Sequence, residues 1–387
     1  MTCAGEGECT SPSPTVPAPP DSFKELRVGQ EGAYTAFGIY NACPESPDGS
    51  RIVFIRFKTA PIGRVRKGQA ELWICNRDLT GYRKIKDLEA DADNHNGAFV
   101  QWLDNDSIAY SGYHIGNGDV YVVNADSGKT EFGPYQGACV GDNTFNTQFL
   151  MAVRSRSSNV GPQGLYLVDG ATGAVRLIFR NTDFVSYASQ WGATNSPADW
   201  YPTHPHLSTD GSHIFFKMAI PSKQYLFIAR VDGSELVYWG PRKPMHTHFY
   251  DEETLWGSDD IVPDGTPNDM HFKRWRSDKT CLGTLAGEGC HTAMSPDKRW
   301  FLGESWYNTN PVVLRLYAAG ETVARAELFA CPHTEMVWGF RGHVNPSFSR
   351  DGKRAYYNRA VSNSLKQAMM VDIASVVDLS KAEPAKP

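Results

Sequence analysis

The segment Leu207-Ser208-Thr209-Asp210-Gly211 contains the pattern that decides the fold: an apolar residue, one or two polar residues, and an Asp-Gly turn. A run rich in β-forming residues follows it. Asp-Gly favours the tight turn of a β-hairpin, because glycine adopts a positive φ without steric cost. Full or looser copies of the pattern recur at 46–49, 102–106, 249–253, 294–298 and 348–352. This recurrence predicts a fold built from repeated units.

The spacing of the copies predicts seven units. Their starts are marked by turn residues near Asp48, Asn105, Asn143, Asp210, Glu252, Asp297 and Asp351. Most spacings are close to the roughly 40 to 50 residues of a four-stranded propeller blade. Further apolar runs closed by turns lie at 71–78, 119–124, 164–169 and 225–232, and no unit has a convincing helical periodicity. We therefore predict an all-β fold, a seven-bladed β-propeller of four-stranded antiparallel blades, with a two-sheet sandwich as the alternative.

The composition fits one large β domain. The 387 residues include 35 glycines and 24 prolines, and 41% of the chain is hydrophobic, which provides both turns and core. We expect a flexible Pro/Ser-rich segment at 1–21, a single propeller at 22–380 and a tail at 381–387.

Charge and hydropathy argue against two classes of partner. The net charge of -5 provides no basic surface for nucleic acid, and no run of 18 apolar residues predicts a membrane span. We expect neither partner, and we expect a monomer. The eight cysteines are too sparse for a disulfide framework, so most are expected to be buried thiols. Residues 1–20 lack the basic and apolar parts of a secretory signal, and the localisation is left open.

Seven of the eleven histidines lie an odd number of residues before the apolar residue of a turn. They are His95, His204, His206, His246, His248, His291 and His343. Because side chains alternate along an uninterrupted strand, all seven are expected on the face opposite that apolar residue. The strand before such a turn is usually the innermost of its blade, so these histidines are expected to border the central channel. For His213, His271 and His333 we expect ordinary hydrogen bonding.

Imidazoles from several blades suit a divalent cation. The candidate ligands are His204, His206, His248, Cys281, Cys290, His291 and His343. Thiolate with imidazole favours Zn²⁺, although the Cys-x8-Cys spacing is not a standard zinc motif, and buried thiols or a disulfide are the alternatives. His95 and His114 lie on successive segments of one unit, where a hairpin would pair them for acid/base work. Ordinary turn hydrogen bonding is the alternative for this pair.

The unit starts in the C-terminal half resemble those of oligogalacturonate lyases. The resemblance is carried by His204-Pro-His206 through Gly211, His246-Thr-His248, Cys290-His291 through Asp297, and Gly342-His343-Val-Asn345 through Gly352. It implies a seven-bladed propeller that holds Mn²⁺ with histidines at the channel mouth. That family has His-Pro-His in its last blade and a glutamine just upstream. This chain has His343-Val344-Asn345 and Phe340, so only His291 and His343 match the manganese shell.

The N-terminal half resembles the propeller-fold ulvan lyases. These use two histidines about one hairpin apart, with a tyrosine and an arginine, and carry a structural zinc bound by His and Cys. The resemblance assigns His95 and His114 to the pair, and His206, Cys281, Cys290 and His291 to the zinc. No motif places the other two groups, for which Tyr201, Tyr187 and Arg154 are chosen by position.

Together the resemblances imply a polysaccharide lyase that cleaves an acidic, uronate-containing poly- or oligosaccharide by β-elimination, with Zn²⁺ or Mn²⁺ as cofactor. Such a reaction needs a group that offsets the uronate carboxylate charge, together with a base and an acid. We assign His114 or Tyr201 as base and acid, and His95 with Arg154 as the groups that offset the charge.

Two other functions compete with this interpretation. One is glycoside hydrolysis by a pair of carboxylates, drawn from Asp119, Asp142, Asp183, Asp199 and Glu304. Most aspartates here are in turns, however, where capping explains them better. The other is a non-catalytic propeller that binds glycan or protein on one face. A binding scaffold does not need seven histidines in register.

Overall fold

The computed structural model describes most of the chain between residues 23 and 377. The described ranges are 23–38, 42–61, 64–93, 97–112, 118–190, 196–220, 223–240, 245–252, 254–258, 269–274, 281–289, 291–305, 311–331, 344–362 and 365–377. Every structural statement below refers to these residues.

The strands of the N-terminal half form two four-stranded sheets and one eight-stranded sheet. The first sheet contains β2 (Tyr34–Ala36), β3 (Arg51–Phe57), β5 (Ala70–Asn76) and β6 (Arg83–Asp87). The second contains β8 (Phe99–Trp102), β9 (Ser107–Ser111), β10 (Asp119–Asn124) and β11 (Thr130–Gln136). The eight-stranded sheet contains β12 (Ala138–Phe145), β13 (Gln148–Val153), β14 (Gly164–Asp169), β15 (Val175–Arg180), β16 (Tyr201–Leu207), β17 (His213–Ile220), β18 (Lys223–Arg230) and β19 (Val237–Gly240).

Three further four-stranded sheets complete the C-terminal half. They contain β20 (Met245–Phe249), β21 (Thr254–Ser258), β22 (Asp269–Arg274) and β23 (Cys281–Glu288); then β24 (Thr292–Met294), β25 (Trp300–Glu304), β26 (Val312–Ala318) and β27 (Ala326–Cys331); and last β28 (Ser347–Phe348), β29 (Arg354–Ser362), β30 (Leu365–Asp372) and β1 (Glu25–Val28). A small ribbon joins β4 (Arg64–Val65) to β7 (Ala92–Asp93).

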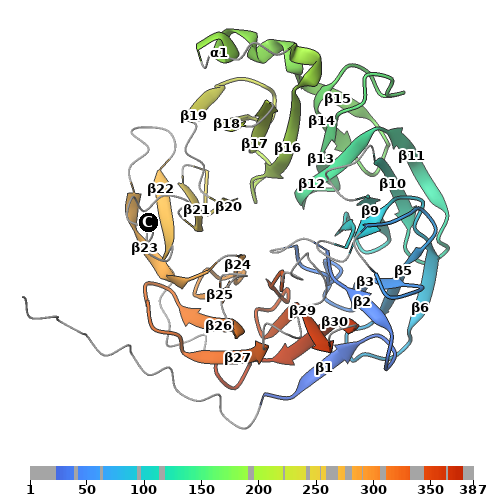
Figure 1. Ribbon diagram of the computed structural model, residues 1–387, viewed down its shortest axis with the longest axis vertical. Coiled ribbons are helices and arrows are strands. Elements are labelled where there is room, and N and C mark those ends of the chain that lie inside the picture. Colours follow the sequence, from blue (N-terminus) through green and yellow to red (C-terminus); the bar gives the residue numbers. More distant parts are fainter. Residues whose placement is uncertain are drawn as a thin grey trace, which may run out of the picture.

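The sheets follow one another in sequence order around a common centre, as the blue-to-red progression in Figure 1 shows. The eight-stranded sheet consists of two antiparallel meanders, β12–β15 and β16–β19, joined by one parallel bridge between Asp142 and His206. We call each four-stranded unit a blade and name it by its strands. The first strand of a blade lies nearest the centre and the last lies at the rim (Figure 1). The predicted all-β fold of propeller type is confirmed, and the sandwich alternative is wrong.

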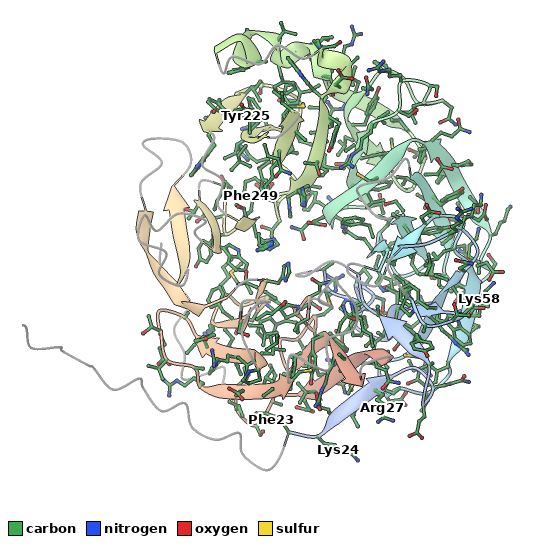
Figure 2. The ribbon with its side chains drawn as sticks, viewed as in Figure 1. Phe23, Lys24, Arg27, Lys58, Tyr225 and Phe249 are labelled. Atoms are coloured by element: carbon green, nitrogen blue, oxygen red, sulfur yellow. The ribbon has the colours of Figure 1, made fainter. Side chains whose placement is uncertain are left out.

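The hydrophobic core lies between neighbouring blades rather than at the centre of the ring. One cluster joins residues of the β24–β27 blade, such as Leu302 and Leu314, to residues of the last blade, such as Tyr357. Between the β16–β19 and β20–β23 blades, the ring of Phe249, which is labelled in Figure 2, packs with its centroid 5.4 Å from that of Phe215. Each blade therefore buries its apolar faces on its neighbours, as expected for a repeat fold.

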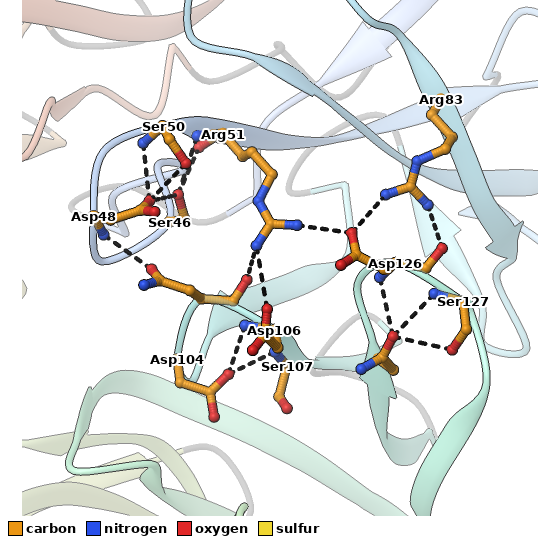
Figure 3. Close-up of polar contacts among 12 residues, drawn as sticks. Ser46, Asp48, Ser50, Arg51, Arg83, Asp104, Asp106, Ser107, Asp126 and Ser127 are labelled. Atoms are coloured by element: carbon orange, nitrogen blue, oxygen red, sulfur yellow. Dashed lines mark hydrogen bonds and ion pairs between the residues drawn. The ribbon is translucent and has the colours of Figure 1, made fainter.

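The recurring Ser-x-Asp pattern forms a hydrogen-bonded turn at the end of the innermost strand. In the first copy, Ser46 Oγ donates to Asp48 Oδ1 over 2.6 Å, and the backbone N–H of Ser50 donates to the same oxygen over 3.0 Å (Figure 3). Gly49 follows with φ of 72°, a left-handed conformation in which glycine is unstrained. The serine–aspartate bond recurs in the turns of Asp210, Asp297 and Asp351.

These turns also connect one blade to the next. The backbone N–H of Asp48 donates to Asn105 Oδ1 in the following blade over 3.0 Å. Arg51 forms an ion pair of 2.9 Å with Asp126, which Arg83 also contacts over 3.0 Å (Figure 3). The Ser-x-Asp turn, which marks each repeat in the sequence, thus also connects neighbouring blades.

The N-terminal strand closes the ring. β1 pairs antiparallel with β30 and becomes the outermost strand of the last blade. Glu25 of β1 accepts a hydrogen bond of 2.6 Å from the hydroxyl of Tyr357 and forms an ion pair with Arg359. Residues more than 300 positions apart in sequence are therefore side by side.

Within the described residues, helical structure is confined to the connection between β15 and β16. It consists of η1 (Asn181–Phe184), α1 (Val185–Gln190) and η2 (Pro197–Asp199), which lie at the rim of the ring (Figure 1). No helix among the described residues is long and apolar enough to cross a membrane. Four described cysteines are outside any disulfide: Cys75, Cys139 and Cys331 are buried, and Cys43 is half-buried.

Candidate functional site at the histidine-rich mouth

Equivalent positions at the starts of four innermost strands define one face of the ring. Three residues before the apolar residue of each turn lie His204, His246, His291 and Asn345. Three of these four residues have a left-handed backbone, with φ of 47° at His204, 50° at His246 and 48° at Asn345. Few residues other than glycine adopt this conformation, although Asn and His do so more often than most. Such outliers cluster at functional sites.

The left-handed histidines coincide with β-bulges. The β16–β17 register shifts between Thr203 and His206, and the β20–β21 register shifts between Met245 and His248. A bulge adds a residue on one strand and breaks the alternation of side chains. The expectation that all the histidines point to one face assumed uninterrupted strands, and β16 and β20 do not meet that condition. Four of the described histidines form two ring pairs, His246 with His291 and His206 with His248.

The first group, which we call the upper group, consists of His246, His291 and Glu304. It joins two blades near the start of their innermost strands. The imidazole rings of His246 and His291 lie 4.3 Å apart between centroids, tilted by 53°. His291 Nδ1 lies 2.9 Å from Oε2 of Glu304, the last residue of β25, and both side chains are buried. A carboxylate on one ring nitrogen of a histidine directs the other nitrogen to a ligand.

The second group, which we call the lower group, consists of Asp142 in β12, His206 in β16 and His248 in β20. His206 Nε2 is 3.2 Å from Asp142 Oδ2 of the preceding blade, and the His206 and His248 rings meet edge to face at 5.4 Å. Phe215 stacks on His206 at 4.1 Å, and Trp256 lies 5.0 Å from His248. These aromatic contacts enclose the group between three blades.

Burial controls protonation in the lower group. It raises the pKa of Asp142 to about 8, an effect that Lys217 opposes, and it lowers the pKa of His248 to about 3. Burial also holds the pKa of His206 well below its ordinary value, with His248 and Lys217 acting in the same direction. Both histidines are therefore neutral near pH 7.

A cationic group lies beside these histidines, where β13 ends and β16 begins. The Arg154 guanidinium lies over the Tyr201 ring, 4.5 Å from its centroid, and Arg154 Nη2 donates to Thr203 Oγ1 over 2.9 Å. Thr203 Oγ1 is in turn 2.9 Å from His204 Nδ1. Lys217 of β17, although 92% buried, pairs in register with Thr203. Arg154 thus contributes a positive charge beside Thr203, which suits an anionic ligand, and the charge of Lys217 acts on Asp142, His206 and His248.

The structure brings together only some of the residues selected from the sequence. Arg154, Tyr201, His204, His206, His248 and His291 lie at this face as described above. His95, His114, Cys290 and His343 lie outside the described residues. Cys281 is the first residue of β23. Across the described part of the chain, no three His, Cys, Asp or Glu residues form a group that could hold a metal ion.

Tyr187 does not reach this face. It lies in α1 at the rim, with its ring 5.3 Å from Phe227 and 6.1 Å from Tyr238 in the core of the β16–β19 blade. These contacts give Tyr187 a packing role in this core, and its catalytic role, which was chosen by position in the sequence, stays a prediction. His213, expected in ordinary hydrogen bonding, contacts Ser212 Oγ over 2.6 Å.

The sequence did not indicate Glu304 or Lys217 as partners of the histidines. Glu304 was considered only as a hydrolase carboxylate, because nothing in its spacing relates it to His291. Lys217 was not considered, although a lysine within the apolar run 213–220 of a buried strand is a usable signal. The sheet register, and not the spacing in sequence, brings both residues close to the histidines.

The carboxylates proposed for glycoside hydrolysis have separate structural roles. Asp119 accepts from the backbone N–H of Gly137, Asp183 accepts from that of Arg180, and Asp199 pairs with Arg156. Asp142 and Glu304 contact histidines of different groups. The described geometry gives no support to a catalytic carboxylate pair among these five.

Comparisons with known proteins establish the fold. No protein-family model matches the sequence, and no curated protein matches it. The structure is similar to that of an oligogalacturonate lyase in complex with manganese, with a TM-score of 0.60 and 13% identity over 94% of this chain and 96% of that chain. An oligogalacturonate lyase from Vibrio parahaemolyticus gives a TM-score of 0.61 and 13% identity over 92% and 96%.

Peptidases share the same architecture. A structure from a study of two prolyl endopeptidases gives a TM-score of 0.55 and 14% identity over 92% of this chain and 49% of that chain. At such low identities the likenesses show the β-propeller fold alone. Since one fold serves several activities, the function must be argued from the site.

Proposed function

We propose that this protein is a lyase that cleaves a uronate-containing oligo- or polysaccharide of the pectic type by β-elimination. The observation that carries the proposal is the Arg154 guanidinium, which lies over the Tyr201 ring and donates to Thr203 beside His204. Its positive charge suits the carboxylate of a uronate. The likeness to oligogalacturonate lyases over nearly the whole chain supports the pectic class. We also infer seven blades, since the five four-stranded sheets and the two meanders supply seven units.

The arrangement supports a division of roles around the sugar. β-Elimination removes the C5 proton of the uronate, and the bond from C4 to the glycosidic oxygen breaks as the double bond forms between C4 and C5. Arg154 would offset the carboxylate charge, which makes the C5 proton removable. Tyr201, 36% exposed at the start of β16, can exchange a proton with the sugar. His95 and His114 stay predictions for the remaining acid/base role.

The upper group supplies two adjacent imidazoles, a ligand type that divalent cations accept, but not by itself a complete set of ligands. We infer that Mn²⁺ or Zn²⁺ would need further ligands besides these two histidines, and Cys290 and His343, which lie outside the described residues, stay the predicted ones. When bound, such an ion supplies positive charge that can offset a carboxylate.

Product formation tests the activity. Purified protein is incubated with oligogalacturonate, polygalacturonate, ulvan and a neutral galactan, and the ultraviolet absorbance of the 4,5-unsaturated product is followed. We expect absorbance to rise with pectic substrates and not with galactan. If folded protein acts on no uronate polymer, the lyase proposal fails. Binding of the same polymers without turnover would then support a glycan-binding propeller.

Arg154 and Tyr201 provide the sharpest variants. We expect Arg154→Ala to lower kcat/KM by about 100-fold or more, because it removes the cation beside the developing charge. Tyr201→Phe keeps the ring and should lower kcat by about 100-fold. The matched control is Arg156→Ala, which removes a nearby arginine that pairs with Asp199 at the surface. Equal activity of the Arg154 and Arg156 variants would contradict the assignment.

A further inference from the structure

A pocket of about 270 Å³ lies at the turn ends of the innermost strands. Residues of several blades line it, and the polar ones are Cys43, Gln101, Asn143, Thr144, Thr209 and Arg350. Gln101 lies near the end of β8, Thr209 in the turn that follows β16, and Arg350 in the turn that follows β28. The histidine-rich mouth lies at the starts of the innermost strands, so the pocket is separate from the proposed lyase site.

Arg350 gives this pocket a positive charge. Its guanidinium donates to the backbone carbonyl of Glu45, through Nε over 3.3 Å and through Nη2 over 3.2 Å. The carboxylate of Glu45 accepts from the backbone N–H of Arg350 and not from its guanidinium. Among the described residues, no carboxylate pairs with this guanidinium, so its charge is available to an anionic ligand.

The neutral lining residues offer hydrogen bonds as well. Gln101 is only 7% exposed, and its amide nitrogen donates to the carbonyl of Gly141. Its amide oxygen accepts from none of the described residues and can therefore accept from a ligand. The Thr144 hydroxyl donates to the carbonyl of Trp102 over 3.2 Å and keeps its capacity to accept. Acceptors of this kind suit the hydroxyl groups of a ligand.

The bulge in β12 shapes one wall of the pocket. The β12–β13 register shifts between Val140 and Thr144, and Asn143 has a left-handed backbone with φ of 64°. Asn143 Nδ2 donates to the carbonyl of Leu207 in the next blade over 3.2 Å. Bulges re-aim side chains next to ligand sites, and residues in sparsely populated conformations cluster there. This wall is a second indication, independent of the charge of Arg350, that the pocket serves a ligand.

We propose that this pocket binds a monosaccharide acid, with Arg350 contacting the carboxylate and with Gln101 and Thr209 contacting hydroxyl groups. Pockets for drug-sized ligands begin at about 300 Å³. A volume of about 270 Å³ therefore suits one sugar ring and excludes a polymer. This inference goes beyond the proposed lyase reaction, because it assigns a binding site without chemistry at the end of the innermost strands that is remote from Arg154.

Calorimetry with galacturonate tests the binding. The chain carries Arg154→Ala, which removes the cation of the mouth, so that binding there does not obscure the result. Two probes separate the parts of the ligand: galactose has the hydroxyl groups without the carboxylate, and acetate has the carboxylate without the hydroxyl groups. We expect both to bind at least about 10-fold more weakly than galacturonate, because each leaves polar groups of the pocket unpaired.

A matched pair of variants at Thr209 tests the location. Thr209→Glu adds a negative charge to the pocket that holds Arg350, whereas Thr209→Gln adds a neutral side chain of the same size. We expect the glutamate variant to bind galacturonate about 10-fold or more weakly than the glutamine variant, because like charges repel. Both variants should unfold in urea as the parent does, since Thr209 is exposed.

Several outcomes would overturn the proposal. They are no binding of galacturonate by the folded chain, equal affinity of the two Thr209 variants, and binding of galactose or acetate as tight as that of galacturonate. Product formation from uronate polymers is measured separately, on the chain with Arg154 intact. Failure of the pocket proposal is therefore distinguishable from failure of the lyase proposal.

Discussion

His246 occupies a backbone conformation that few histidines adopt. Its φ of 50° recurs at the equivalent His204 and Asn345, and Asn143 has φ of 64° at the neighbouring bulge of β12. Asparagine tolerates this region better than alanine does, because its short polar side chain bonds locally. Asn345, at the equivalent position, thus indicates that asparagine is accepted at position 246.

The stability of two variants at this position should differ for that reason. We expect His246→Ala to be less stable than His246→Asn by about 1 kcal/mol, because alanine is strained in the left-handed region. The measurement is the free energy of unfolding in urea. The control is the same pair of substitutions at His213, a strand residue without a positive φ, where the two variants should differ little. A similar difference at both sites would refute the argument from strain.

At the scale of the element, the Ser-x-Asp turn is held by the charge of its aspartate as well as by its backbone conformation. Burial opposes ionisation of Asp351, but hydrogen bonds from Arg77, Ser349 and the Lys353 backbone outweigh it and lower its pKa to about 2. The pKa of Asp210 is also lowered to about 2, with burial again outweighed by its two serines. The turns therefore stabilise the fold in their ionised form.

The stability of the protein should fall in acid for this reason. An unfolded aspartate has a pKa of about 3.9, so the contribution of Asp351 is complete above that pH and is lost as pH falls toward about 2. We expect Asp351→Asn to be less stable than wild type at neutral pH, by about 1 kcal/mol or less because the carboxylate is 40% exposed. The difference should shrink between pH about 4 and about 2.

Urea unfolding at several pH values measures this effect. Ser349→Ala is the companion variant, because it removes the 2.7 Å hydrogen bond to Asp351 and leaves the carboxylate in place. Its pH dependence should lie between those of wild type and Asp351→Asn. A constant difference between wild type and Asp351→Asn across this pH range would show that the turn carboxylate is not the titrating group.

At the scale of the whole molecule, closure of the ring depends on a buried glutamate. Glu45 is fully buried between the first and last blades. Its carboxylate accepts from Arg77 Nε over 2.9 Å, from the backbone N–H of Arg350 over 2.8 Å and from the Tyr356 hydroxyl over 2.5 Å. The network therefore joins the first blade to the last blade, where the two ends of the ring meet.

Removal of this carboxylate should cost more than removal of an exposed one. We expect Glu45→Ala to lower the free energy of unfolding by about 3 kcal/mol, because it leaves buried donors without an acceptor. Glu31→Ala is the control: Glu31 pairs with Arg27 at the surface, and its loss should cost less than about 1 kcal/mol. Equal losses in urea unfolding would argue against a role of Glu45 in closure.

Prediction from the sequence succeeded where local chemistry decides the outcome. The turns at Asp48, Asp210 and Asp351 form as predicted, because serine and aspartate bond to each other within four residues. The predicted direction of the histidines depended on uninterrupted strands, and the bulges in β16 and β20 add a residue without any signal in spacing. For Tyr187, nothing in the spacing indicates that the connection that carries it packs at the rim.

The sequence by itself determined that this protein is a ring of antiparallel blades, since turn chemistry and apolar strands are local properties. It also supplied the histidines, Arg154 and Tyr201. Only the tertiary structure decided that His246 meets His291, that Glu304 holds His291, and that Arg154 lies over Tyr201. These contacts join different blades or different strands, and the register and bulges that create them arise only when the sheets pack.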